Sequence, residues 1–295
     1  MALYISILIF VIFFRTETKL VHLTTEESTW FVGITPIAMT IGVLLSIPVS
    51  EKIGRKKLFF ISNMFAIVGY VLMYFASSLI ALVAGRTTQC VGMGLGAMTI
   101  GVFLSEISTV NMRGPLIGIS QTSCCIGLLL VTSICIFLPI EFLSLIMALH
   151  SFIVIIFLFF IPGSPQWLVR NNKEGQARQS LKKLRGNTYP GVDMEITEIR
   201  NCIKENNSVE KGSISNALNT RTFTAPLLVF TVIFIVLGSC GNDTFVFYGP
   251  TIFSKIDIGI PTPVLSTLPW IGFSIGYASK GSTYSFFRRK YTDNR

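Results

Sequence analysis

Long apolar runs dominate this chain, and short polar segments separate them. Most runs approach or exceed the ~20 residues that a helix needs to cross a bilayer; they are Trp30–Val49, Leu58–Ser78, Leu79–Leu104, Leu116–Leu138, Phe142–Ile161 and Pro226–Tyr248. A shorter run at Ala2–Phe14 precedes them, and a proline-interrupted run at Ile258–Ala278 follows. A helix satisfies its own backbone hydrogen bonds in lipid. The pattern therefore predicts an all-α fold, a polytopic transmembrane bundle with eight helices.

The positive charges occupy alternate loops between these runs. Nearly all of the 24 Lys and Arg residues lie in four regions, which are the loop Lys52–Lys57, the loop at Arg113, the segment Pro162–Ala225 and the tail from Lys280. Short loops that are rich in Lys and Arg stay on the cytoplasmic side of a membrane. With the first helix starting inside, both termini are therefore expected in the cytoplasm.

Composition supports a membrane protein and excludes several other classes. Hydrophobic residues make up 51% of the chain and charged residues 13%, against about 25% charged in a soluble domain. The net charge of +9 fits contact with an anionic lipid bilayer better than contact with nucleic acid. The six cysteines show no metal-ligand spacing, and no catalytic triad or phosphate-binding loop is apparent. The sequence thus predicts neither a metal site, nor a cofactor, nor an enzyme.

Four short motifs lie at the ends of the predicted helices. They are Glu51-Lys-Ile-Gly-Arg-Lys-Lys57, Gly85-Arg86 followed by Gly92-x-Gly94-x-Gly96, Ser105-Glu106 with Arg113-Gly114 and Gln121, and Pro162-Gly-Ser-Pro-Gln-Trp-Leu168. In this order they resemble the D-R-x-G-R-R/K, G-R-x-x-x-G-x-G-x-G, S-E-x…R-G…Q and P-E-S-P-R-W-L motifs of the sugar porters, a family of the major facilitator superfamily. The segment Leu23–Trp30 further resembles the L-T-x-E-x-x-S-W segment of insect facilitated trehalose transporters.

This resemblance implies the N-terminal six-helix half of such a carrier, followed by about two helices of the C-terminal half. The expected domains are a transmembrane bundle at 1–161, a cytoplasmic loop at 162–225, a partial C-terminal bundle (helices 7 and 8) at 226–279 and a basic cytoplasmic tail at 280–295. Helices 9 to 12 of the family are expected to be missing. Within the cytoplasmic loop, Ala177, Leu181 and Leu184 recur at helical spacing, which predicts a short amphipathic helix on the cytoplasmic face.

The resemblance also implies facilitative transport of a sugar of the trehalose or glucose class across the plasma membrane, by alternating access and without a coupling ion. A sugar presents many donors and acceptors without charge, which amide groups can match. The implied substrate-binding residues are Gln121, Asn242 and Asp243. By the same resemblance, gating and structural roles fall to Glu51, Gly54, Arg55, Arg86, Glu106 and Arg113.

Several of these residues also have purely structural explanations. Gln121 can bridge two helices, and the spacing of Gly92 and Gly96 favours close helix packing over contact with substrate. Arg86 can snorkel outward or face a partner or a cavity. Glu106 and Arg113 are expected at the cytoplasmic rim together with Arg55, where a solvated ion pair would contribute little to stability.

The chain departs from the family pattern at sites that bear on function. Gly163 and Gln166 stand where the family has Glu and Arg, and Leu237 and Gly238 stand where helix 7 carries two sugar-binding glutamines, with Asp243 in place of Asn. These departures favour an alternative: a transport-incompetent, truncated paralogue that acts as a membrane sensor or partner, or a partial gene product. The carrier hypothesis predicts saturable uptake that Gln121→Ala abolishes. The alternative predicts a membrane-localised chain that moves no trehalose or glucose.

Overall fold

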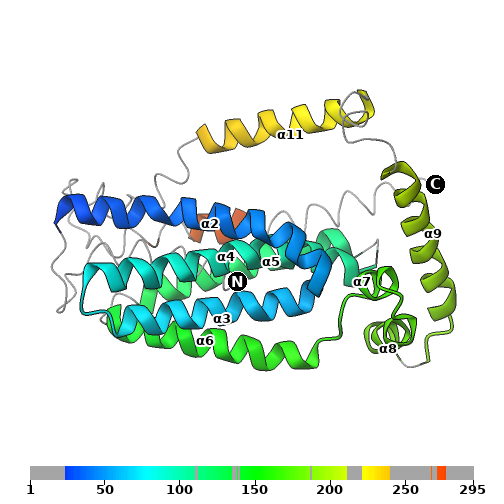
Figure 1. Cartoon of the computed structure of the whole chain (residues 1–295), viewed down its shortest axis with the longest axis horizontal. Coiled ribbons are helices and arrows are strands. Elements are labelled where there is room, and N and C mark those ends of the chain that lie inside the picture. The colour runs from blue at the N-terminus through cyan, green and yellow to red at the C-terminus, as the bar shows by residue number, and fades with distance from the viewer. Residues whose placement is uncertain are drawn as a thin grey trace. The chain divides into compact units, whose positions relative to one another are not determined.

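The computed structural model describes residues 24–109, 112–134, 138, 140–186, 188–210, 221–239, 267 and 271–276. Every regular element among them is an α-helix, as the apolar pattern predicts (Figure 1). The predicted first helix, Ala2–Phe14, lies outside the described residues, and of the predicted last helix only 271–276 is described as helical. Contacts divide the chain into two compact units, one of Met1–Ser164 with Pro250–Arg295 and one of Pro165–Gly249.

Long apolar helices form the described part of the first unit. They are α2 (Thr25–Ile53), α3 (Arg55–Tyr74), α4 (Leu79–Ile107), α5 (Arg113–Ile134) and α6 (Ile140–Phe160). Each of these five is long and apolar enough to cross a membrane. Helix α4 packs along both α2 and α3, and α3 also packs against α6, so that these helices lie side by side (Figure 1).

The helix boundaries fall within a few residues of the predicted runs. Within the first unit, the largest extension at a helix start is in α2, which begins at Thr25 rather than at Trp30. A capping box accounts for it: the Thr24 hydroxyl accepts from the Glu27 N–H at 3.3 Å, and the Glu27 carboxylate accepts from the Thr24 N–H at 2.8 Å. These reciprocal bonds satisfy backbone donors that the first turn of a helix leaves without partners.

Glycines on α4 allow unusually close contact with its two neighbours. A Cβ added at Gly94 would lie 2.1 Å from the Met39 carbonyl oxygen of α2, and one added at Gly92 would lie 2.7 Å from the Ser62 carbonyl oxygen of α3. Both distances are far below van der Waals contact, so a side chain at either position would push the helices apart. Close helix packing therefore explains Gly92, which lies against α3. Gly94 has the same role against α2.

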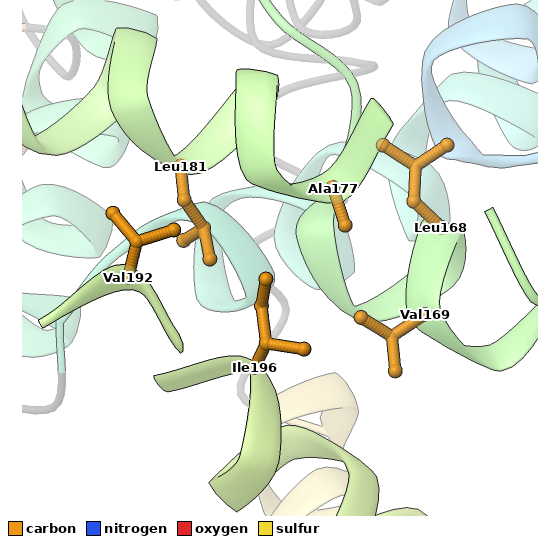
Figure 2. Close-up of a cluster of buried hydrophobic side chains, with 6 residues drawn as sticks. All are labelled: Leu168, Val169, Ala177, Leu181, Val192 and Ile196. Carbon is orange, nitrogen blue, oxygen red and sulfur yellow. The ribbon is translucent and has the colours of Figure 1, made fainter. Parts of the chain in front are cut away.

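The second unit has its own small apolar core, built by α7 (Pro165–Arg170), α8 (Glu174–Arg185) and α9 (Val192–Glu210). The predicted helical spacing is confirmed, since Ala177 and Leu181 share the buried face of α8. Figure 2 shows that this face points toward the flanking helices, and the cluster consists of Leu168, Val169, Ala177, Leu181, Val192 and Ile196. The apolar face of α8 is thus covered by protein.

Ion pairs reinforce this second core at its edge. Arg185 contacts Glu195 at 2.9 Å with both side chains partly buried, and Arg178 contacts Asp193 at 2.8 Å with both exposed. Both pairs join α8 to α9. Since exposed pairs contribute at most about 1 kcal/mol, burial of the apolar cluster is the main stabilising interaction.

The remaining described helix of the second unit is α11 (Arg221–Ser239). The apolar pattern predicts a helix at Pro226–Tyr248, so α11 begins five residues earlier, and residues 240–248 lie outside the described part of the chain. Pro226 is the sixth residue of this helix and lies inside it, where its missing N–H removes one backbone hydrogen bond. Large apolar side chains such as Leu228 and Ile235 are exposed along it.

Candidate functional site

A one-residue turn brings charged residues of two helices together. Helix α2 ends at Ile53 and α3 begins at Arg55, so that only Gly54 lies between them. The φ of Gly54 is 91°, a backbone conformation that favours glycine, and its N–H donates to the Ser50 carbonyl at 3.1 Å. The chain therefore reverses tightly enough for Arg55 Nη2 to reach Glu51 Oε1 on α2 at 2.8 Å.

Arg55 also reaches a carboxylate from a distant part of the chain. Its Nε donates to Glu106 Oε1 at the end of α4 at 3.0 Å, and the other oxygen of Glu106 accepts from the hydroxyl of Ser164. Ser164 follows α6 in the sequence. We call Glu51, Arg55, Glu106 and Ser164 the Arg55 cluster.

The central ion pair of this cluster is buried. The side chain of Arg55 is 7% exposed and that of Glu106 is 8% exposed, whereas Glu51 is 45% exposed. Ionised donors and acceptors make shorter and stronger hydrogen bonds than neutral ones. Removing one partner of a buried pair leaves the other charge desolvated and costs about 3–5 kcal/mol. The contact is therefore costly to break while the helix ends stay together.

Lys56, the next residue of α3, binds a third helix. Its ammonium donates to the Ile161 carbonyl at 2.6 Å and lies 3.5 Å from the Phe159 carbonyl. Phe159 lies in the last turn of α6 and Ile161 directly follows the helix, where backbone acceptors have no partner within the helix. Two consecutive residues of α3 thus bind the ends of two other helices.

Other residues that the resemblance implies lie elsewhere. Arg113 begins α5 and is exposed, and within the described residues no hydrogen bond or ion pair joins it to Arg55 or Glu106. Gln121 lies on α5 and is half-buried. Asn242 and Asp243 lie outside the described residues.

Arg86 is fully buried inside the helical bundle at 1% exposure. It does not snorkel outward: Nη1 donates to Gln89 Oε1 at 2.9 Å and Nε to Thr35 Oγ1 of α2 at 3.4 Å, with the Phe31 ring 6.0 Å away. The Gln89 amide donates in turn to the Tyr70 hydroxyl of α3 at 3.2 Å. Of the two alternatives for Arg86, the structure supports the one in which it faces partners.

Sequence reasoning missed Lys56 and Ser164 as individual contacts. Both residues lie inside the sequence motifs described above, but their partners are more than 50 residues away in the chain. It also missed Thr35, Gln89 and Tyr70. The available signal was polarity itself, because a polar side chain within an apolar span needs a hydrogen-bonding partner.

The chemistry available to the Arg55 cluster is the making and breaking of contacts between helix ends. Within this cluster, Arg55 donates to Glu51 and Glu106, and Ser164 donates to Glu106. The described residues include no group of three or more His, Cys, Asp or Glu side chains placed to bind a metal. Side-chain contacts of the cluster link α2, α3, α4 and the segment after α6, and Arg55 Nη1 also donates to the Ser50 carbonyl of α2 at 3.2 Å.

Comparison with known proteins gives a consistent result. The family model described as "Sugar (and other) transporter" matches residues 1–275. Sugar transporter ERD6-like 6 of Arabidopsis thaliana is 29% identical over 242 residues, which cover 82% of this chain and 49% of the relative. Probable metabolite transport protein CsbC of Bacillus subtilis is 25% identical over 252 residues, covering 84% of this chain and 53% of the relative. The chain thus spans about half the length of the curated relatives that it matches.

Solved structures agree on the fold. The partially occluded, inward-open xylose transporter XylE from E. coli matches with a TM-score of 0.73 at 16% identity, covering 92% of this chain and 67% of that one. The same proton:xylose symporter bound to 6-bromo-6-deoxy-D-glucose matches with a TM-score of 0.70 at 18% identity, covering 94% of this chain and 66% of that one. The all-α bundle is therefore of the major facilitator superfamily type, and the chain belongs to the sugar transporter family.

Proposed function

We propose that this chain serves facilitative transport of a sugar across the plasma membrane by alternating access. Membership of the sugar transporter family supports the activity, and the buried Arg55–Glu106 contact is the observation that carries the mechanism. Alternating access requires that one face of the bundle close while the other opens. The Arg55 cluster would hold the cytoplasmic ends of the helices together in the closed arrangement and release them in the other.

The energy scale of the cluster suits such a switch. Two conformations that interconvert usefully differ by a few kcal/mol, and a charge-assisted hydrogen bond contributes about 1.5–3 kcal/mol. Arg55 makes two such bonds to carboxylates, those of Glu51 and Glu106, and a third to the Ser50 carbonyl. When the ends separate, water can solvate each charge, so the desolvation cost is removed as the contacts are lost. The net difference between the two arrangements then stays small enough for a sugar to shift it.

The sugar class that we propose is trehalose or glucose. The similarity of Leu23–Trp30 to insect facilitated trehalose transporters supports the former. Gln121 on α5 would donate and accept hydrogen bonds with sugar hydroxyls, and Asn242 with Asp243 would complete the site. Leu237 and Gly238 stand where the family has glutamines, so fewer polar contacts are expected and the affinity should be low.

Sugar uptake into oocytes that display the full chain at their surface tests the proposal. We expect saturable uptake of radiolabelled trehalose or glucose. Gln121→Ala should reduce the apparent affinity by about tenfold or more, since an unmatched buried polar group costs about 1–3 kcal/mol. Gln176→Ala, on the exposed face of α8, removes the same amide elsewhere and should leave uptake unchanged.

An absence of saturable uptake at confirmed surface expression would contradict the carrier proposal. That result would agree with a membrane sensor or partner that does not transport. Equal effects of Gln121→Ala and Gln176→Ala would contradict the assignment of Gln121 to the sugar site.

A further inference from the structure

The cytoplasmic ends of three helices and the segment after α6 form a closed ring of contacts. Arg55 of α3 binds Glu106 of α4, Glu106 binds Ser164, and the chain runs back from Ser164 to Ile161, whose carbonyl binds Lys56 of α3. Each link comes from a different residue, and all of them lie in the first unit. The ring therefore attaches the end of α6 to the Arg55 cluster at two separate points.

Each attachment has a physical reason. The last carbonyls of a helix lack partners within the helix and carry a partial negative charge, which the ammonium of Lys56 matches. Ser164 is 3% exposed, and its hydroxyl occupies the oxygen of Glu106 that Arg55 leaves free. The short stretch between them, 162–163, carries no charged side chain. The two attachments thus lie on either side of this short stretch.

We propose that Lys56 and Ser164 are positioning residues of the gate, which fix the end of α6 to the Arg55 cluster so that α3, α4 and α6 separate together. This inference rests on the proposed gating role of the cluster. Without the two attachments, Arg55 and Glu106 would still pair, but Glu106 would lose one partner and the end of α6 would lose its contacts with Lys56 and Glu106. The closed arrangement would then open more often.

A buried reporter at the same end can measure this opening. Ser108 follows α4, is 6% exposed and donates to the Ser105 carbonyl in the last turn of that helix, so Ser108→Cys is a small change. The full chain in lipid nanodiscs would carry this substitution with Cys135, Cys202 and Cys240 replaced by serine. The rate of modification by a membrane-impermeant maleimide then reports how often the helix ends separate, and the same protein without Ser108→Cys gives the background.

Removing either attachment should accelerate this labelling by about tenfold, the equivalent of one charge-assisted hydrogen bond. The variants are Lys56→Gln and Ser164→Ala. Because both open the same ring, the double variant should label less than the product of the two single effects predicts. Lys56→Arg keeps the charge and the donors and should restore slow labelling.

Matched controls isolate the contacts from general effects. Lys57→Gln removes the same charge from the adjacent, exposed position. Ser105→Ala removes a hydroxyl whose bond, to the Val102 carbonyl, stays within α4. Neither should change the labelling rate. All variants should also show the same monodisperse elution profile, so that a misfolded protein is recognised.

Arg55→Gln separates this inference from the proposed gate. If Arg55→Gln accelerates labelling but Lys56→Gln and Ser164→Ala do not, the positioning role is contradicted and the gate stands. If none of the three variants accelerates labelling, both are contradicted. Acceleration by Lys56→Gln and Ser164→Ala alone supports the attachment of α6 and contradicts the gating role of Arg55. Purely multiplicative effects in the double variant would contradict the closed ring.

Discussion

Two buried arginines of this bundle are accommodated in different ways. Arg55 contacts the carboxylates of Glu51 and Glu106 at a helix end, where the proposed opening of the bundle would admit water. Arg86 lies within the span of α4 and donates to the neutral oxygens of Gln89 and Thr35. A charge at that depth has no access to water and depends on its fixed partners. In the proposed gate, the contacts of Arg55 can therefore break when the helix ends separate, whereas the contacts of Arg86 persist.

Gly94 provides a test of close helix packing at the scale of one atom. Gly94→Ala places a Cβ 2.1 Å from the Met39 carbonyl oxygen, so α2 and α4 must separate. We expect a loss of about 1–3 kcal/mol in stability, the usual cost of overpacking, measured as a lower midpoint of thermal unfolding in detergent. Gly101→Ala lies on the same helix with no atom within 4 Å and serves as the control. A midpoint equal to that of Gly101→Ala would contradict the observed helix contact.

At the scale of the element, local polar residues determine where the first described helix begins. The capping box of Thr24 and Glu27 lies within the segment Leu23–Trp30 that resembles trehalose transporters. Part of that resemblance thus has a structural cause, since Thr-x-x-Glu is a signal for the start of a helix. The apolar pattern alone could not place the start, because the first turn of α2 is polar.

The capping box makes the start of α2 sensitive to acid. The backbone N–H of Thr24, followed by its hydroxyl, hydrogen-bonds the Glu27 carboxylate and lowers its pKa from the ordinary value of 4.5. Because the pKa of Glu27 is lowered in the folded state, its ionised carboxylate stabilises the start of α2 at pH values above the ordinary pKa. This stabilisation is lost as the pH falls through the lowered pKa. We expect hydrogen-exchange protection of the first turn of α2 to decrease over that range. Glu27→Gln should remove the pH dependence; the same acid-induced loss in that variant would contradict the assignment.

The cluster of α7, α8 and α9 predicts a cooperative unit that depends on Leu181. This side chain is 0% exposed, and Leu181→Ala should cost about 2–5 kcal/mol through lost burial and a residual cavity. Faster hydrogen exchange throughout α8 would report the loss. Met194→Ala, at a position 68% exposed on α9, should have little effect. If Leu181→Ala also left hydrogen exchange in α8 unchanged, the conclusion that the apolar cluster stabilises these helices would be contradicted.

At the scale of the whole molecule, the distribution of charge predicts the orientation in the membrane. The sequon Asn206-Asn207-Ser208 lies in α9, within the segment expected on the cytoplasmic side. It should remain unglycosylated in a eukaryotic cell because it never meets the lumen. The measurement is a glycosidase-sensitive shift in mass, which Asn206→Gln would remove if the sequon were used.

A matched sequon on the opposite side gives the positive control for this orientation. Thr16→Asn creates Asn-Glu-Thr in the segment between the first two predicted helices, which is expected in the lumen. Glycosylation there together with none at Asn206 supports the orientation. The reverse pattern would show that the bundle inserts with its basic loops outside.

The sequence by itself determined the elements, the family and several local contacts. Runs of apolar residues predict spanning helices because the bilayer sets both their length and their composition. Glu51 and Arg55 meet because a single glycine separates their helices, and Ala177 and Leu181 share a face because helical periodicity requires it. The order of the motifs identified the sugar transporter family, which the family comparison then showed.

Only the tertiary structure decided which distant residues meet. Arg55 and Glu106 are 51 positions apart, Ser164 and Glu106 are 58 apart, and Lys56 and Ile161 are 105 apart. No periodicity encodes such pairs, because they depend on how far each helix is shifted and rotated against the next. Glycines such as Gly94 set that packing by letting backbones touch. For the same reason the sequence left Arg86 between two alternatives, and the packing of α2 and α3 around α4 decided between them.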